Sequence, residues 1–421
     1  MPRLLILADD LSGAADCAAA LVSSGFSASV VLASLEETRD CEILSIDCNT
    51  RHLEPEAAAS RLAEIFLPYA KNRELLLYKK LDSTLRGNVA VELAAILATR
   101  RKSFSTEPQA VVLLAPAFPA RGRTTVDGHQ FIHGVPLHES EIWKHEQSSS
   151  STHIPSMLES AGLRTLQLDL KLVRSERKLL QKAMNSFATT FDVIVCDAET
   201  DEDLYSIMSA SLSLDREIIW AGSAGLAYHL SNALEIRNEN SVAAYPLSFH
   251  GPILIVIASM SSMAKHQIEV LGATSTVKIL PVDSYVLIAG CNTPEWSQYA
   301  MDLEAMLRAG HDVVVTPKAD TQLSSEHGRS ISSALGVMMT PFADVAGVLI
   351  ASGGETARAV LDAWGVKGIQ MIEEIEPGLP LSVTKGCNKS LLVVTKAGAF
   401  GDSHTLLRAW QSLRNLVELS S

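Results

Sequence analysis

The stretch "LLILADDLSGAADCAAAL", residues 4–21, predicts a strand that runs directly into a helix. Residues 4–8 form the continuous apolar run of a buried parallel strand, and residues 12–24 are rich in Ala and Leu, as expected of the helix that follows. Asp9 and Asp10 stand between the two elements. Because open α/β sheets bind ligands at the carboxyl ends of their strands, at least one of these carboxylates is expected to face a substrate.

A helix cap offers a second explanation for these aspartates. An aspartate before a helix accepts hydrogen bonds from the unpaired amides of the first turn and is stabilised by the positive end of the helix dipole. One such residue is enough for a cap, and the sequence has two. From the residues alone, either aspartate can be the cap and either can face a substrate.

The composition indicates a globular protein of two domains. The chain has 421 residues, of which 47% are hydrophobic and 20% charged, so it is long enough for more than one core and is not a disordered chain. Its formal charge is −13 and it has no pronounced cluster of Lys and Arg, which argues against a nucleic-acid partner. An anionic small substrate remains open, because local charge decides its binding. A homo-oligomer also remains open.

The cysteines and the hydropathy favour a cytoplasmic protein. The six cysteines are scattered without a CxxC pair, which predicts buried free thiols in a reducing compartment. The amino terminus leads straight into a strand and shows no signal peptide. No uncharged apolar stretch approaches the roughly 18 residues that a membrane span needs, so we expect no membrane partner.

Short apolar strands alternate with amphipathic or Ala-rich helical segments along the chain. The alternation predicts an α/β fold with two domains, each a mostly parallel sheet with flanking helices. Residues 235–251 are polar, contain proline and lose helical periodicity, and they predict a linker. We therefore expect a first domain over residues 1–235 and a second over residues 250–421.

The most informative stretch of the second domain is "VLIASGGETARAVLDAWG", residues 348–365. A strand ends at Ser352, Gly353 and Gly354 allow a close turn, and a helix begins. Such a turn presents backbone amides to a phosphate, although a plain two-glycine hinge has the same pattern. Further strand ends in residues 257–263 and 393–402 carry small or hydroxyl residues, which favours a nucleotide site. The chain has neither a GxxxxGK[ST] loop nor a dinucleotide fingerprint.

The stretch "LYKKLDSTLRGNVAVE", residues 77–92, gathers polar groups after a strand of the first domain. It contains Lys79, Lys80, Asp82, Ser83, Thr84 and Arg86. Cations that pair with a carboxylate, together with hydroxyls and a carboxylate that bond to alcohols, suit a small hydroxy acid. A capped turn with solvated lysines is the alternative.

Arg51 and a long loop add further candidates to the first domain. Arg51 follows another strand end, and residues 116–137 lack a clear periodic pattern, which predicts a functional loop. That loop contains Arg121, Arg123, Asp127, His129 and His133. His129 and His133 are four residues apart, but nearby glycines and a proline argue against a helix and no other ligand pattern completes a zinc site.

These motifs together resemble the four-carbon acid sugar kinase family. The resemblance rests on "ADDLSGAAD", "KKLDSTLRGN", "PAFPARGRTTVDG", "GSAGLA", "SGGETA" and "TKAGAFGD", which occur in the family's order over nearly the whole chain. It implies a sugar-acid-binding domain over residues 1–235 and a nucleotide-binding domain over residues 250–421. It also implies transfer of a phosphoryl group from ATP, with Mg²⁺, to the terminal hydroxyl. D-threonate is the favoured substrate, with D-erythronate and 3-oxo-tetronate as alternatives.

The resemblance also assigns site residues. It places the sugar acid against Asp10, Arg51, Leu81, Asp82, Ser83 and Thr84, and the nucleotide against Ser259, Gly353, Gly354, Glu355, Thr356 and Gly398. Lys80, Arg51 or Arg86 would hold the carboxylate of the acid. Asp82 or Asp10 would orient the attacking hydroxyl and accept its proton, so these two are the catalytic candidates. With Asp10 assigned to the substrate hydroxyls at the domain cleft, we expect Asp9 to cap or buttress the turn. The Mg²⁺ ligands are not identified.

One departure from the family and two other classes of function stay open. Relatives often have a sequence close to "SGSxS" where this chain has "ASMSSM", so Met260 replaces a glycine beside Ser259 and Ser261. A nicotinamide-linked hydroxy-acid enzyme is the runner-up, disfavoured by the absence of the dinucleotide fingerprint. A sensor that closes on a sugar acid without catalysis is the third.

Overall fold

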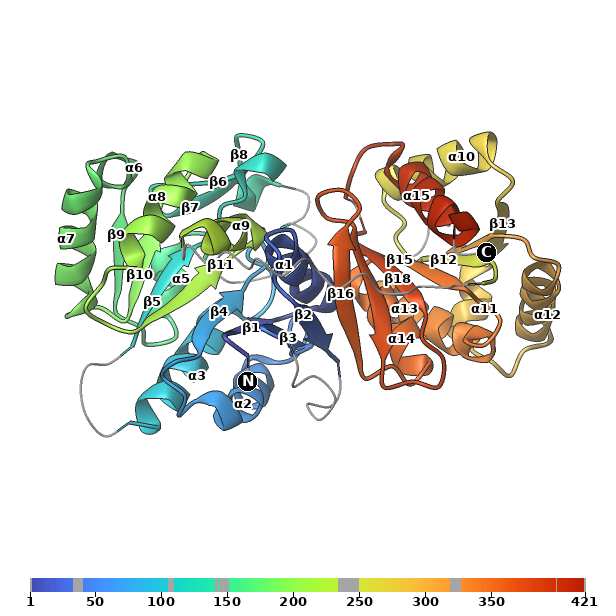
Figure 1. Ribbon diagram of the computed structural model, residues 1–421, viewed down its shortest axis with the longest axis horizontal. Helices are drawn as coiled ribbons and strands as arrows, with labels where there is room; N and C mark the ends of the chain where they lie inside the picture. The colour runs from blue at the N-terminus through green and yellow to red at the C-terminus, as the bar shows by residue number, and fades with distance from the viewer. Residues whose placement is uncertain are drawn as a thin grey trace. The chain divides into compact units, whose positions relative to one another are not determined.

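The computed structural model describes residues 2–32, 41–104, 110–140, 143, 151–233, 250–318, 327–398 and 400–419. The chain divides into two compact units. Figure 1 colours the chain by residue number, from blue at the N-terminus to red at the C-terminus. The first unit comprises Met1–Phe26 and Asp40–Glu239, and the second comprises Ser27–Arg39 and Asn240–Ser421. Each has a sheet with flanking helices, which confirms the predicted fold class. Most of the expected linker lies outside the described residues.

The first unit is built on a parallel sheet with the strand order β3-β1-β4-β11-β5-β10-β9. In that order the strands are Ile43–Asp47, Leu4–Ala8, Leu76–Lys80, Ile218–Gly222, Val111–Ala115, Val193–Cys196 and Thr165–Leu168. Every residue of β1, β3, β5 and β10 is buried, because helices cover both faces of the sheet. The continuous apolar runs of the sequence reflect this burial.

The helices of the first unit form two groups, one on each face of the sheet (Figure 1). One group packs in the order α1 (Leu11–Val22), α9 (Ala224–Ala233), α8 (Asp201–Ser211), α7 (Arg177–Ala188). The other group comprises α2 (Pro55–Phe66), α3 (Val89–Lys102) and α5 (Ile154–Glu159). The short helices η1 (Leu67–Tyr69) and α6 (Leu170–Val173) complete the unit's main layers.

A small antiparallel sheet occupies the stretch that the sequence predicted to be a loop without regular structure. Its strands are β6 (Arg123–Val126), β7 (His129–Ile132) and β8 (Val135–Pro136), flanked by η2 (Pro119–Arg121) and η3 (Leu137–Glu139). Two-residue turns join the strands, and both residues of each turn have positive φ: Asp127 and Gly128, then His133 and Gly134. Such turns match the twist of paired strands. That part of the loop prediction was therefore wrong, because the hairpins are too short to show alternation.

The sheet of the second unit has the order β13-β14-β12-β15-β18-β17-β16-β2. In that order the strands are Lys278–Val282, Val313–Pro317, Ile253–Ile257, Val348–Ser352, Leu392–Lys396, Pro380–Lys385, Gly368–Glu374 and Ala28–Val31. The first five strands in this order, β13, β14, β12, β15 and β18, are parallel to one another. The pairs β18–β17, β17–β16 and β16–β2 are antiparallel. Strand β2 lies within residues 1–235, the range predicted for the first domain, yet it pairs with β16 of the second sheet. Its four apolar and small residues carry no information about which sheet they join.

Helices pack around this second sheet in two sets. One set pairs α10 (Ser262–Thr274) with α15 (Thr405–Leu419), and the other contains α11 (Ser284–Ala289), α12 (Pro294–Arg308), α13 (His327–Met339), η4 (Thr340–Phe342) and α14 (Gly354–Ala363). Ile253, Ile255 and Ile257 of β12 share a core with Leu271 of α10 and Leu413 of α15. Within the described residues no helix is both long and apolar enough to cross a membrane.

The six cysteines, all within the described residues, form no disulfide, as the sequence predicted. Cys17, Cys41, Cys48 and Cys196 are buried, but Cys291 is exposed and Cys387 is half-buried. The expectation of burial therefore holds for four of them only.

Candidate active site

Three adjacent strands of the first unit bring the predicted polar residues to one edge of its sheet. Ala8, the last residue of β1, pairs with Asp47 at the end of β3 and with Lys80 at the end of β4. The chain segments that follow these strands are therefore neighbours. The backbone N–H of Thr50 and that of Arg51 both donate to the carbonyl oxygen of Asp9, at 3.1 and 3.3 Å.

Arg51 forms the centre of this edge and is held by both aspartates. Its Nε and Nη2 donate to Asp9 Oδ2 and Oδ1 at 2.7 and 3.0 Å, and its Nη1 donates to Asp10 Oδ2 at 2.7 Å. The side chains of Arg51 and Asp9 are only 12% and 3% exposed. Burial alone would raise the pKa of Asp9, but the charges of Arg51 and Lys79 hold that pKa below its ordinary value. Arg51 is thus a fixed cation between the carboxylates of Asp9 and Asp10.

Asp10, and not Asp9, is the cap of α1. Its backbone is extended, with φ −144° and ψ 164°, and its Oδ1 accepts a hydrogen bond from Gly13 N at 2.8 Å. The expectation that Asp9 caps the helix is wrong, whereas its expected role as a buttress is what the contacts with Arg51 show. The assignment of Asp10 to the substrate stays a prediction.

The turn after β4 is organised around Asp82. Arg86 donates to Asp82 from Nε at 2.6 Å and from Nη2 at 3.3 Å, and the Thr84 hydroxyl donates to the same carboxylate. Positive φ values at Leu85 (56°) and Gly87 (86°) allow the chain to curl tightly. Burial would raise the pKa of Asp82, but the charges of Arg86 and Arg51 hold it well below its ordinary value. An ionised carboxylate of this kind is a strong hydrogen-bond acceptor and a weak base.

The two lysines at the end of β4 point to opposite faces of the sheet, as successive residues of a strand do. Lys79 is fully buried and forms an ion pair with Glu92 of α3, with Nζ 2.9 Å from Oε2. Lys80 donates from Nζ to the carbonyl oxygen of Leu81 at 2.8 Å. A Cβ added at Gly13 of α1 would lie 2.8 Å from Lys80 Nζ and 2.7 Å from Asp10 Oδ1, so the ammonium group lies against the first turn of α1 beside Asp10. Lys80 therefore lies beside the candidate site and Lys79 lies in the core.

The other residues of this turn contribute through their backbone. The Leu81 side chain is buried, and its N–H donates to the carbonyl oxygen of Gly222. The carbonyl oxygen of Ser83 accepts a hydrogen bond from Gln130 Nε2 at 2.8 Å, which joins the turn to β7. The small sheet is thereby attached to the candidate site.

The second unit brings another set of predicted residues together. Ser352 at the end of β15 pairs with Ile257 at the end of β12 and with Lys396 at the end of β18. A Cβ added at Gly398 would lie 3.3 Å from Ser259 Oγ and 4.0 Å from Gly353 Cα. The three strand ends therefore converge, as the sequence predicted.

The turn from β15 into α14 suits a phosphate group. Gly353 is the N-cap, with φ 107°, and has no side chain with which to cap the helix. Gly354 and Glu355 begin α14, so the amides of the first turn are left to other acceptors. Ser352 Oγ is buried without a hydrogen-bond partner within the described part of the chain. An uncapped helix start beside an unpaired hydroxyl fits a bound nucleotide phosphate.

Two of the predicted nucleotide-binding residues are engaged within the protein. Thr356 is buried, and its Oγ1 lies 3.4 Å from Ser332 Oγ of α13, so only its backbone is available to a ligand. Ser259 Oγ donates to Ser261 Oγ at 3.1 Å, and Ser261 caps α10 by accepting from Ala264 N. The "ASMSSM" departure thus keeps both serine hydroxyls at the start of α10.

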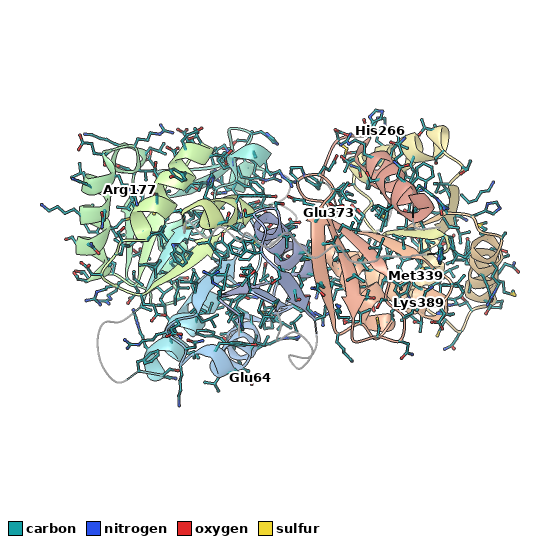
Figure 2. The ribbon with its side chains drawn as sticks, viewed as in Figure 1. Glu64, Arg177, His266, Met339, Glu373 and Lys389 are labelled. Carbon is teal, nitrogen blue, oxygen red and sulfur yellow. The ribbon has the colours of Figure 1, made fainter. Side chains whose placement is uncertain are left out.

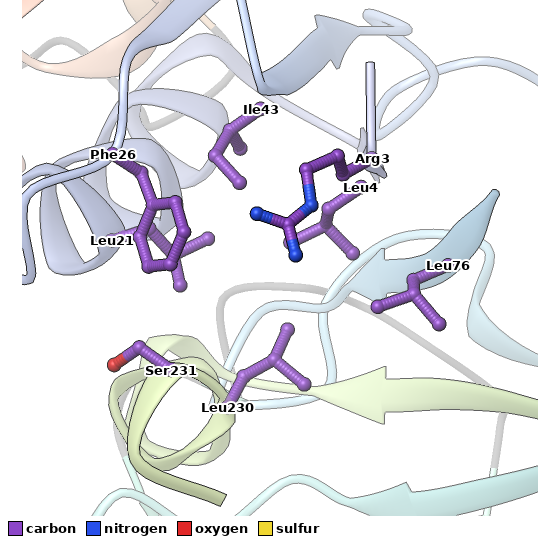
Figure 3. Close-up of a pocket in the computed structure, with 8 residues that line it drawn as sticks. All are labelled: Arg3, Leu4, Leu21, Phe26, Ile43, Leu76, Leu230 and Ser231. Carbon is purple, nitrogen blue, oxygen red and sulfur yellow. The ribbon is translucent and has the colours of Figure 1, made fainter. Parts of the chain in front are cut away.

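The pocket of Figure 3 lies at the opposite end of the first unit's strands. Its lining includes Leu4, Ile43 and Leu76, which are the first residues of β1, β3 and β4. Apart from Arg3 and Ser231 the lining is apolar, which does not suit a polyhydroxy acid.

Comparisons with known proteins agree with the division of the chain into two domains. A family model for a sugar-binding N-terminal domain matches residues 4–230, and one for a nucleotide-binding C-terminal domain matches residues 254–406. A D-threonate kinase from Cupriavidus necator is 35% identical to this chain, over 97% of both. The chain belongs to the four-carbon acid sugar kinase family. It is therefore a kinase, which excludes the two alternatives of a nicotinamide-linked hydroxy-acid enzyme and a non-catalytic sugar-acid sensor.

Other relatives of this kinase span the family's substrates. A D-threonate kinase from Salmonella typhimurium is 28% identical over 97% of both chains, and further relatives are named D-erythronate kinase and 3-oxo-tetronate kinase. A crystal structure of a Salmonella typhimurium LT2 protein has a TM-score of 0.79, with 21% identity, and covers 98% of this chain and 100% of that chain. That likeness shows the shared fold.

The kinase has one candidate residue that the sequence did not single out from its loop. Arg123 begins β6, is half-buried, and donates from Nη1 to the carbonyl oxygen of Arg121 at 2.8 Å. Its Nε is buried and has no partner among the described residues. Burial lowers the pKa of Arg123, while the charge of Asp82 raises it, which places the guanidinium near the 82–86 turn. A half-buried guanidinium whose Nε is buried without a hydrogen-bond partner among the described residues is the signal, and only the tertiary structure shows it.

The histidines of the same region do not form a metal site. His129 stacks against His153, with ring centroids 4.7 Å apart, whereas the His133 ring lies against Gly122. Across the described ranges, no group of three or more His, Cys, Asp or Glu side chains could hold a metal ion. In kinases Mg²⁺ is usually held by one or two carboxylates together with the phosphates of the substrate. The carboxylates of the described residues therefore fit a Mg²⁺ ion that is bound together with the phosphates of ATP.

Proposed function

We propose that this kinase transfers the γ-phosphoryl group of ATP to the terminal (4-) hydroxyl of D-threonate and forms 4-phospho-D-threonate. The observation that carries the proposal is the cluster of fixed cations and carboxylates around Arg51 and Asp82, in the part of the chain matched by the sugar-binding model. The names of the Cupriavidus necator and Salmonella typhimurium relatives support D-threonate as the substrate.

Arg123 is our candidate for binding the carboxylate of the acid. Arg51 and Arg86 are already paired with aspartates, and their charges are neutralised within the protein. Arg123 has an Nε beside this cluster that is unpaired within the described ranges. Since a guanidinium binds a carboxylate through parallel N–H donors, Arg123 can anchor one end of the substrate, with Lys80 as a second cation.

Asp82 and Asp10 are our candidates for the hydroxyl end of the substrate. The low pKa of Asp82, maintained against burial by Arg86 and Arg51, makes it suited to orient the attacking hydroxyl through a hydrogen bond rather than to hold its proton in the ground state. Phosphoryl transfer depends mainly on in-line positioning and on charge neutralisation, so orientation is the larger contribution. Asp10 keeps free acceptor positions on a carboxylate that already caps α1.

The second unit would hold ATP. The amides that follow Gly353, together with Ser259 and Gly398, line the proposed phosphate position. Mg²⁺ bound with ATP supplies neutralisation of the phosphate charge during transfer. We propose that the kinase acts in the cytoplasm, because its free cysteines belong to a reducing compartment.

An assay of ADP release tests the substrate assignment. The purified kinase is supplied with ATP, Mg²⁺ and, separately, D-threonate, L-threonate, D-erythronate and 3-oxo-tetronate. The proposal expects the highest kcat/KM for D-threonate. A higher value for D-erythronate or 3-oxo-tetronate would reassign the substrate within the family, and no ADP release with any of them would refute the function.

The role of Arg123 is tested with a substitution that removes its charge. Arg123→Met is expected to raise the KM for D-threonate by about 10-fold to 100-fold, as expected for the loss of a charged hydrogen bond. The uncharged analogue D-threitol should bind equally to both proteins. Arg164→Met is the control, since Arg164 pairs with Asp192 at the other end of the sheet. An unchanged KM for D-threonate in Arg123→Met would exclude this residue.

A further inference from the structure

Lys396, the last residue of β18, is a buried ammonium group without a carboxylate partner in the part of the chain that the structure describes. It is 1% exposed. Its Nζ donates to the carbonyl oxygens of Ala397, Gly398 and Phe400, at 3.0, 3.1 and 3.1 Å. Buried lysines are ordinarily paired with an acid, so carbonyl oxygens alone are an unusual set of partners.

The arrangement requires the charged form of the lysine. An ammonium group has three N–H donors and no acceptor, and here each N–H has a carbonyl partner. A neutral amine would direct a lone pair at one of these oxygens. Burial lowers the pKa of Lys396 to about 8, so the charged form that the carbonyls need is lost not far above neutral pH.

The carbonyls belong to the loop that lines the proposed phosphate position. Gly398 lies against Ser259, and the N–H of Gly353 donates to the carbonyl oxygen of Lys396 itself at 2.6 Å. In a trans peptide the N–H points opposite to the C=O. Holding the carbonyl of Ala397 toward the ammonium therefore turns the N–H of Gly398 away from it, in the loop whose Gly398 lies against Ser259.

The neighbouring polar groups are engaged elsewhere. Gln267 of α10 donates to the carbonyl oxygens of Phe400 and Asp402, at 2.9 and 2.7 Å. The side chain of Asp402 accepts from Arg408 of α15 and from the N–H of His404. Neither Asp402, His404 nor Arg408 contributes to the pKa of Lys396, for which burial is the one cause.

We propose that Lys396 is a positioning residue of the nucleotide site, whose ammonium group shapes the loop after β18 and adds positive charge beneath the phosphates of ATP. The proposal rests on the assignment of ATP to the second unit. It gives a role to a buried charge whose partners, in the described part of the chain, are backbone carbonyls. It also predicts that nucleotide affinity depends on the protonation of one lysine.

Lys396→Met tests the proposal because methionine has a similar length and no charge. The dissociation constant of a non-hydrolysable ATP analogue with Mg²⁺ is measured by calorimetry at pH 7.5. We expect it to rise by about tenfold or more, as for the loss of a charged hydrogen bond, while D-threonate binds as in the wild type. A thermal melt of the same sample shows that the variant is folded.

Lys389→Met is the matched control. Lys389, labelled in Figure 2, also donates to backbone carbonyls, those of Asp344 and Ala346 at 3.0 and 2.8 Å, and burial lowers its pKa too. It precedes β18, whereas Lys396 ends that strand, so it lies at the opposite edge of the sheet. Its variant should bind the nucleotide as the wild type does.

A pH profile supplies a readout that a purely structural lysine would not give. Between pH 7.5 and 9.5 the wild-type affinity for the analogue should fall as Lys396 loses its proton, and the profile of Lys396→Met should be flat. If the variant does not fold, the wild-type profile decides alone. Equal affinity in wild type and Lys396→Met, or a wild-type affinity constant over this range, overturns the proposal. A wild type that binds no nucleotide overturns the assignment of ATP as well.

Discussion

Arg51 donates to Asp9 through Nε and Nη2, at 2.7 and 3.0 Å, in a pair that is almost entirely enclosed. The pair explains why the first strand ends in two aspartates. Asp9 fixes the cation, and Asp10 caps α1 while its second oxygen accepts from the same guanidinium. The position of Arg51 in the candidate site thus depends on the Asp9 carboxylate, which pairs with it inside the protein.

Asp9→Asn is expected to destabilise the kinase and to weaken binding of D-threonate. Removing one partner of a buried ion pair leaves the other charge uncompensated, which costs about 3 kcal/mol of unfolding free energy. Urea denaturation measures that loss, and the KM for D-threonate reports the displacement of Arg51. Wild-type values of both quantities would contradict a buttressing role.

Acid should destabilise the wild type more steeply than Asp9→Asn. The folded-state pKa of Asp9 lies below its ordinary 3.8, because Arg51 and Lys79 outweigh the effect of burial. Its contribution to stability is therefore complete above about pH 4 and is lost as the pH falls through the folded pKa. Unfolding free energies between pH 2.5 and 6 measure this, and parallel curves for the two proteins would refute it.

Asp82→Asn should lower turnover more than substrate binding. The substitution keeps the shape of the side chain but removes the charge that accepts from Arg86, Thr84 and the proposed substrate hydroxyl. We expect kcat to fall by roughly 10²-fold, within the range for a positioned acid or base. The control is Asp192→Asn, because Asp192 pairs with Arg101 and Arg164 away from the site. A wild-type kcat in a folded Asp82→Asn protein leaves Asp10 as the candidate.

Gly398→Ala should raise the KM for ATP and leave that for D-threonate unchanged. The added Cβ would lie 3.3 Å from Ser259 Cβ and Oγ, tighter than ordinary contact, so the loop or the serine must shift. Gly328→Ala in α13 meets no atom within 4 Å and provides the control. Steady-state kinetics with each substrate varied in turn distinguish the two variants, and equal KM values for ATP would count against the close approach.

Lys79→Met and Lys80→Met should have opposite signatures. Lys79 is paired with Glu92 in the core, so its loss should reduce the unfolding free energy by about 3 to 5 kcal/mol with little change in KM. Lys80 lies beside Asp10 and α1, so its loss should raise the KM for D-threonate with a smaller effect on stability. Denaturation and kinetics on both variants test this, and the reverse pattern would exchange the two roles.

Local pattern was sufficient for the architecture. The apolar run of residues 4–8, the Ala-rich segment after it and their repetition along the chain predicted parallel sheets, since fully buried strands are apolar throughout and helices between them show their own period. The same logic placed Ser259, Gly353 and Gly398 at strand ends. Register then brought them together, because parallel strands end at one edge.

Fold class, family and the set of polar residues follow from the amino-acid sequence alone, because periodicity and motifs of neighbouring residues carry them. Only the tertiary structure decided which aspartate caps α1, which lysine of β4 is in the core, and that Ala28–Val31 joins the second sheet. It alone showed that, among the described residues, the buried Nε of Arg123 has no hydrogen-bond partner and the buried ammonium group of Lys396 bonds to backbone carbonyls. The physical reason is that partnership and burial are set by contacts between residues distant in the chain, and no local pattern records them.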